Sequence, residues 1–192
     1  VTTVYPGQRV ALNLSGVSSQ SIKRGEIITT PDLFSPTNAV DAICQLLESA
    51  ARPLYHNSKA TFFSGAATTP CLIRLLDTDK MIAGSKAKTQ IVLESKLVLA
   101  RGDNFVLRRN DTTIGGGIIL DSHARRHKRH DQTTIQRLNT ILDPTDIETF
   151  FQFLMQIMPI TVSRLSKQLG LPLADVVKAV SNIHSSSFAS EI

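Results

Sequence analysis

Short apolar segments separated by turn-forming residues run through the first two thirds of the sequence. The turn-forming residues include Gly65, Pro70, Gly84 and the pair Gly102-Asp103. Several short strands at a spacing of roughly 8–12 residues are typical of an antiparallel barrel or sandwich. We therefore expect strands at residues 60–63, 71–76, 90–100, 104–109 and 112–120.

Two other segments alternate between apolar and polar positions, which is the period of a strand. Val10, Leu12 and Leu14 predict one strand, with turn signals before it at residues 6–7 and after it at residues 24–25. Residues 40–46 alternate less cleanly, so both a strand and a helix stay open there.

The last third of the chain has apolar residues at helical spacing instead. The pattern predicts helices over residues 132–142 and 145–158, and a short helix that ends at Gly170. Pro172 then opens a helix whose inward positions would be Val176, Val177, Val180 and Ile183. Two short helices joined by a glycine turn form the helix-turn-helix pattern. The sequence thus predicts an α+β multidomain fold, an antiparallel β-barrel followed by an all-α, winged-helix domain.

The ends of the chain and its cysteines exclude several classes of protein. No apolar run approaches the length of a transmembrane helix, and the first ten residues lack the pattern of a secretory signal. The chain has no initiator methionine, so we expect a piece of a longer protein. Its two cysteines, Cys44 and Cys71, have no metal-ligand spacing, which favours free buried thiols in a reducing cytosol.

The positive charge is concentrated in one short run. The formal net charge is +5, and the run from His123 to His130 alone holds four cations and three of the five histidines. Residues 132–192, which hold most of the predicted helices, carry a net charge of −1. A basic run of this kind is either a solvated linker or a nucleic-acid contact, and the two interpretations stay open.

No residues form a catalytic motif. The sequence has no phosphate-binding loop of the G-x-x-x-x-G-K-[ST] type, and no local Ser/His/Asp or Cys/His constellation. Acidic residues such as Asp77 and Asp79 lie in a predicted turn, where they are more often turn residues than general acids. We expect neither catalytic residues nor an enzyme activity in this piece.

Two other clusters have a structural and a functional interpretation. Gly115, Gly116 and Gly117 inside a predicted strand mark a bulge, a sharp bend or a close backbone approach, and they also leave room for a ligand. His123, His127 and His130 could hold zinc on one face of a helix, but the interleaved cations would repel a dication. We therefore expect no metal site.

Three stretches resemble a known family. Residues 6–17 and 22–31 (PGQRVALNLSGV and IKRGEIITTP) are similar to the end of the second domain of translational GTPases. Residues 52–130 resemble the third domain of elongation factor Tu relatives. The GDNFVLR and TIGGG motifs and the RRHKRH exit look most like the bacterial selenocysteine-specific elongation factors. The helical region is similar to the first winged helix of that family.

The resemblance implies a domain plan. Residues 1–31 would be the last strands of domain II, 32–122 the domain III barrel, 123–138 a basic linker and 139–192 a winged helix with a truncated wing. Because the rest of domain II is missing, we expect residues before Pro31 to pack on the barrel, pair with another copy or lack order.

The resemblance also implies an RNA-binding role. Such factors bring selenocysteyl-tRNA to the ribosome at a stop codon marked by an mRNA hairpin, and they bind GTP and Mg through a domain absent here. They are cytoplasmic and have no membrane partner, and this fragment would hold no cofactor. The implied RNA contacts are guanidinium, ammonium, amide and backbone groups that suit phosphate: Arg108, Arg109, Asn110, Gly115, Gly116, Gly117, Arg125, Arg126, Lys128 and Arg129.

A DNA-binding regulator with a winged helix and a β sensor domain is the main alternative. Its third helix would enter the major groove and would need several phosphate contacts. That helix carries Lys178 but also Asp175. The placement of charge therefore favours an RNA-facing barrel and linker. A barrel enzyme is a third possibility, but it would need a pocket of convergent titratable groups that the sequence does not indicate.

Overall fold

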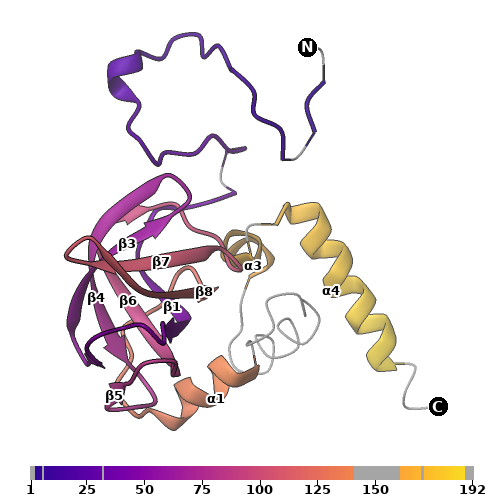
Figure 1. Ribbon diagram of the computed structural model, residues 1–192. Helices are drawn as coiled ribbons and strands as arrows, with labels where there is room; N and C mark the ends of the chain where they lie inside the picture. Colours follow the sequence, from indigo (N-terminus) through magenta and orange to yellow (C-terminus); the bar gives the residue numbers. More distant parts are fainter. Residues whose placement is uncertain (1–2, 6, 32, 141–160, 170, 189–192) are drawn as a thin grey trace.

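The computed structural model describes residues 3–5, 7–31, 33–140, 161–169 and 171–188 (Figure 1). Its strands close an antiparallel barrel in the order β1-β6-β4-β3-β7-β8, and β2 and β5 form a separate two-stranded sheet. The barrel strands are β1 (Thr37–Leu46), β3 (Ser58–Ser64), β4 (Ala67–Leu75), β6 (Lys86–Leu97), β7 (Asn104–Arg109) and β8 (Thr112–Asp121). The short pair is β2 (Leu54–Tyr55) and β5 (Lys80–Met81).

The interior of the barrel is filled by alternate residues of its strands. In β1, the buried apolar positions are Val40, Ala42, Cys44 and Leu46. Their alternation decides between the strand and the helix that the sequence left open. On the neighbouring strands β3 and β7, the rings of Phe62 and Phe105 stack with centroids 5.2 Å apart. Closure leaves no edge strand in the barrel, so its backbone groups are paired all the way round.

The strand predictions for residues 60–120 are confirmed, and the bounds of β7 are those predicted. The strands β2 and β5 were not predicted, because a segment of two residues has no periodicity. Pro70 is not a separator but lies inside β4, opposite Thr61 of β3. Pairing of β4 with β6 begins only at Cys71, and beyond it the Ser95 amide donates to the Thr69 hydroxyl instead. A residue without an N–H is tolerated where the ladder opens.

The glycines of β8 lie at a close approach of three strands. A Cβ on Gly115 would overlap the carbonyl oxygen of Gln45, and one on Gly117 would overlap that of Ile43 in β1. A Cβ on Gly116 would overlap the Phe105 carbonyl oxygen of β7. The register of β7 against β8 shifts just beyond Leu107, as at a β-bulge. The glycines thus allow the barrel to close.

The helices pack on the outer surface of the barrel. They are α1 (Gln132–Thr140), α3 (Val162–Leu169) and α4 (Leu173–Phe188), and Figure 1 shows α1 along one end of the barrel. A second apolar core joins Leu76 and Leu120 of the barrel to Leu138 of α1, Leu165 of α3 and Val176 of α4. Burial of these side chains is what attaches the helices to the barrel.

The helices at 132–140, 162–169 and 173–188 confirm the predicted ones, and the helix expected over 145–158 lies outside the described residues. Val177 is a correction, because it is 47% exposed rather than inward. None of the described helices is both long and apolar enough to span a membrane.

The strand predicted at residues 10–14 is absent. Residues 7–31 hold only a 3₁₀ turn at Ser19–Ser21, and Val10 and Leu12 are exposed. Alternation gives a strand only where a neighbouring strand takes its N–H and C=O groups, and no described strand lies beside this segment. The segment does reach the barrel at Gly25, where positive φ and a close approach to Ala67 leave no room for a Cβ.

The two thiols offer a test of the core. Burial raises the pKa of both Cys44 and Cys71 to about 12, so the reactive thiolate is nearly absent at neutral pH. We expect neither thiol of the native protein to react with Ellman's reagent at a pH of about 8, and both to react in guanidinium chloride. Rapid labelling of the native protein would contradict this packing.

The glycines offer a second test. Gly117→Ala is expected to lower the free energy of unfolding by about 1–3 kcal/mol, because its Cβ has no space beside the Ile43 carbonyl. Urea denaturation measures the loss. Thr113→Ala, an exposed position in the same strand, is the control and should change stability little. Equal stability of the two variants would contradict the close approach.

Candidate nucleic-acid interface

Residues 123–131, here called the basic segment, are tied to the barrel by hydrogen bonds. The His130 amide donates to the Leu76 carbonyl at 2.9 Å, and Gln90 Nε2 donates to the Arg125 carbonyl at 2.7 Å. The last residue of the segment, Asp131, caps α1 by accepting from the Thr134 amide at 3.0 Å. These bonds give the cations of the segment defined positions.

Hydrogen bonds from Thr134 also favour the ionised form of the capping residue, Asp131. The hydroxyl and the amide of Thr134 lower the pKa of Asp131 below its ordinary value. The cap therefore stays ionised at neutral pH, where its negative charge favours the N-terminal end of α1.

A buried carboxylate joins the basic segment and α1 to the barrel. Asp41 Oδ2 in β1 lies 2.7 Å from His127 Nε2 and 2.7 Å from Arg137 Nη2, while Asp41 Oδ1 accepts from Gln90 Nε2 at 3.3 Å. Arg137 Nη1 also reaches Asp121 Oδ2 at 3.4 Å. The Asp41 side chain is 0% exposed. We call Asp41, Gln90, His127 and Arg137 the Asp41 cluster.

Within the Asp41 cluster, opposing effects act on the pKa of the Asp41 carboxyl group. Burial raises the pKa of Asp41, and the nearby Asp121 adds to the rise. The hydrogen bond from His127 and the charges of His127 and Arg137 act in the opposite direction. A buried carboxylate without such partners would carry a large desolvation cost. The position of the basic segment is therefore set by the requirement to satisfy Asp41.

A cavity of about 580 Å³ opens where the basic segment meets β4 and the turn before β3. We call it the basic pocket, and its lining residues are His56, Asn57, Arg74, Leu76, Arg126, His127, Lys128 and Arg129. Four of these are cations, two are imidazoles and none is acidic. Arg129 pairs with Asp79, whereas Arg126 and Lys128 form no ion pair with any residue that the structure describes. The pocket is a concave surface lined by more cations than any other charged group, an arrangement that attracts anions.

The hairpin between β7 and β8 carries the other predicted cations. Asn110 and Asp111 both have positive φ, 46° and 63°, which is the two-residue turn favoured between antiparallel strands. Arg108 donates to the Asp111 carbonyl, and its guanidinium lies 5.7 Å from the centroid of the Phe63 ring. Arg109 Nε donates to the Lys59 carbonyl at 3.4 Å. Both arginines therefore also brace their own hairpin.

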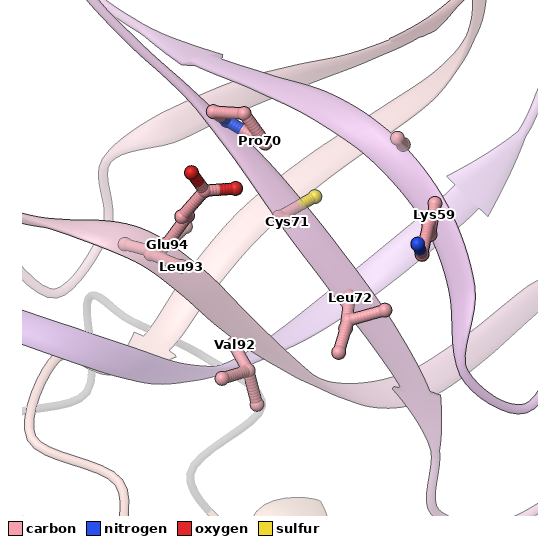
Figure 2. Close-up of a pocket in the computed structure, with 8 residues that line it drawn as sticks. Lys59, Pro70, Cys71, Leu72, Val92, Leu93 and Glu94 are labelled. Atoms are coloured by element: carbon pink, nitrogen blue, oxygen red, sulfur yellow. The ribbon is translucent and has the colours of Figure 1, made fainter.

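The outer face of β3 and β4 connects the hairpin to the basic pocket. Lys59 pairs with Leu72, and Arg74 lies two residues beyond Leu72 on the same face of β4. Lys59, Leu72 and Val92 also line an outer cavity of about 330 Å³, where Figure 2 shows Lys59 and Glu94 on opposite sides. A row of cations thus runs from Arg109 through Lys59 to Arg74, with Glu94 of β6 beside it.

The barrel and the beginning of the basic segment match one protein family. Residues 40–126 match the family described as selenocysteine-specific elongation factor, beta-barrel domain. The barrel is thus similar to the beta-barrel domain of the selenocysteine-specific elongation factors.

Curated relatives agree with this assignment. The chain is 28% identical over 137 residues to the selenocysteine-specific elongation factor of Desulfomicrobium baculatum. The aligned region covers 70% of this chain and 22% of the relative. It is 32% identical over 127 residues to the selenocysteine-specific elongation factor of Haemophilus influenzae, which covers 64% of this chain and 20% of the relative. The chain therefore matches about a fifth of the length of these relatives.

The basic pocket combines residues that the sequence predicted with residues that it did not. Arg126, Lys128 and Arg129 come from the predicted basic run, whereas His56 and Arg74 were missed. Arg74 is a single polar residue in an apolar strand, and His56 lies in a polar turn that has no basic run of its own. Only the fold brings the two to the basic segment. Outward alternation in β4 is the one signal that could have pointed to Arg74.

The other predicted site residues have different surroundings. Arg125 is exposed, and its carbonyl is the group that binds Gln90. The neighbours of Gly115, Gly116 and Gly117 are backbone atoms of β1 and β7, which supports the structural interpretation of that cluster.

The three histidines of the basic run have three separate partners. His123 contacts Ser122, His127 contacts Asp41 and His130 contacts Asp79. Among the residues that the structure describes, no group of three or more His, Cys, Asp or Glu side chains is placed to hold a metal ion. Separate hydrogen bonds therefore position these imidazoles one by one.

The Asp41 cluster makes a stability prediction. Asp41→Asn removes the charge that Arg137 and His127 pair with, and we expect it to lower the free energy of unfolding by about 3 kcal/mol. Denaturation in urea measures the change. The control is Asp77→Asn, which breaks the part-exposed pair with Lys88 and should cost about 1 kcal/mol or less. An equal cost for both variants would contradict a central role for Asp41.

Proposed function

We propose that this chain is a non-catalytic, RNA-binding part of a selenocysteine-specific elongation factor that delivers selenocysteyl-tRNA to the ribosome at recoded stop codons. The family of the barrel and the names of the curated relatives support this role. In the proposal, GTP and Mg bind elsewhere in the full-length cytoplasmic factor, and this piece binds RNA without chemistry.

The basic pocket is the observation that carries the proposal. It gathers four cations without a carboxylate among its lining residues. Charges of one sign held together in a concave surface repel each other, and a polyanion relieves that repulsion. Guanidinium and ammonium groups suit phosphate oxygens and do not distinguish bases, so the binding would depend on RNA backbone shape.

We propose further that the hairpin residues Arg108, Arg109 and Asn110 extend the contact along the barrel. The row of cations through Lys59 and Arg74 supports one continuous path for a sugar-phosphate backbone. Gly115, Gly116 and Gly117 would contribute through the shape of the barrel wall. The RNA of this path is, in the proposal, the tRNA.

The helices have a connecting role in this proposal. We assign α3 and α4 to a winged helix that leads toward later modules for the mRNA hairpin. α4 carries Asp175 in its first turn and one cation, Lys178, among its described side chains, which suits a connector better than a DNA-reading helix. The domain boundaries 31/32, 122/123 and 138/139 belong to the same proposal.

Titration with three nucleic acids tests the proposed function. We expect the full 192-residue chain to bind tRNA more tightly than duplex DNA or an mRNA hairpin, with affinity that falls as salt rises. Fluorescence anisotropy at two salt concentrations measures both. Tight, salt-insensitive binding to duplex DNA would overturn the proposal in favour of a DNA-binding regulator.

A charge-matched pair of variants locates the contact. Arg125→Ala with Arg126→Ala should weaken tRNA binding and flatten the salt slope by about two units if both residues touch phosphate. The control is Lys23→Ala with Arg24→Ala, which removes the same charge from two exposed residues of the N-terminal segment. Equal slopes for both double variants would mean that the basic segment makes no RNA contact.

A further inference from the structure

The basic pocket has a wall that exists only when the basic segment is docked. His56, Asn57, Arg74 and Leu76 come from the barrel, and the rest of the lining comes from residues 126–129. The docked position is held by the His130 amide bond to Leu76 and by the hydrogen bond between His127 and Asp41. If the segment left the barrel, the cations on the two sides would separate and the pocket would be lost.

The same residues connect the pocket to α1. His127 lines the pocket and bonds to Asp41 Oδ2, and the same oxygen accepts from Arg137 of α1. On the other side, Arg74 Nη1 lies 3.4 Å from Gln90 Oε1, and Gln90 Nε2 bonds to Asp41 Oδ1. Two residues of the pocket wall are therefore linked to α1 through one buried carboxylate.

Docking gathers like charges at the pocket, and the protein offsets them only in part, through Asp79 beside Arg129 and Asp131 near Lys128. Arg74 lines one cavity with Arg126 and Lys128, and neither of these last two cations forms an ion pair with a residue that the structure describes. Like charges brought together destabilise the docked state. An anion bound between them would turn this repulsion into attraction, and it would do so only in the docked state.

We propose that the basic pocket is a phosphate-binding site whose occupation locks the helical region onto the barrel. This inference rests on the proposed function for the source of the phosphate, the backbone of a bound RNA strand. Binding and docking are reciprocal, because a ligand that binds only the docked form stabilises that form by its own binding free energy. RNA binding thereby fixes the position of α1 relative to the barrel.

Hydrogen exchange with pyrophosphate as the probe tests this coupling. The His130 amide is the reporter, because its bond to Leu76 exists only when the segment is docked. At a pyrophosphate concentration about ten times its Kd, we expect that amide to exchange about ten-fold more slowly. Potassium chloride at the same ionic strength should have no such effect, and equal protection by both salts would overturn the site.

Two sets of variants test phosphate binding in the basic pocket and its coupling to α1 separately. Arg126→Gln with Lys128→Gln should weaken pyrophosphate binding about ten-fold or more, whereas Lys23→Gln with Arg24→Gln should not. Arg137→Lys keeps the positive charge but loses the planar group that bonds both Asp41 and Asp121. Although Arg137 does not line the pocket, this variant should weaken pyrophosphate binding about five-fold or more. Unchanged binding in Arg137→Lys would overturn the coupling.

The outcomes also distinguish this inference from the proposed function. If the chain binds tRNA with a steep salt dependence but pyrophosphate does not protect the His130 amide, the pocket is not the phosphate site and the RNA-binding proposal stands. If pyrophosphate protects that amide but tRNA does not bind, the pocket is a phosphate site and the RNA-binding proposal fails.

Discussion

The arrangement of the barrel, the basic segment and α1 depends on the buried carboxylate of Asp41. It lies on the outer face of β1, where it would meet water if nothing covered it. His127 and Arg137 cover it and bond to it, and Gln90 completes its shell. Because an unpaired carboxylate at this depth is costly, the covered state requires these partners in these positions.

The apolar contacts and the Asp41 cluster have different roles in the contact between the barrel and the helical region. Leu76 and Leu120 of the barrel bury area against Leu138, Leu165 and Val176 of the helices, and burial is not directional. The charged hydrogen bonds of Asp41 are directional, so they select one orientation of the basic segment among those that burial alone would allow. The pocket of cations follows from that orientation, since His127 and its neighbours on both sides line it.

Local pattern was sufficient for the strands of the barrel other than β1, because alternation and turn residues act over a few positions. It was sufficient for α1, α3 and α4 for the same reason. The exposed side chain of Val177 shows that helical periodicity predicts only approximately which residues face the core. It failed at residues 10–14, where the alternation predicted a strand. Alternation shows which residues would share a face, but a strand also needs a neighbouring strand to pair with. It also failed for Asp41, whose partners lie 86 and 96 positions away, and for His56 and Arg74, which reach the basic run only through the register of β3 and β4.

The position of the positive charge has a consequence for the proposed binding of a phosphate backbone. A basic face confined to one rigid element would bind a backbone without affecting anything else. Here the cations lie where the barrel meets the basic segment: Arg74 belongs to the barrel, and Arg126 and Lys128 belong to the segment that leads into α1. A phosphate between them contacts both parts at once, so its binding energy also acts on their relative position. In the proposal, phosphate binding and the orientation of the helices are then one equilibrium, with the Asp41 cluster as the shared element.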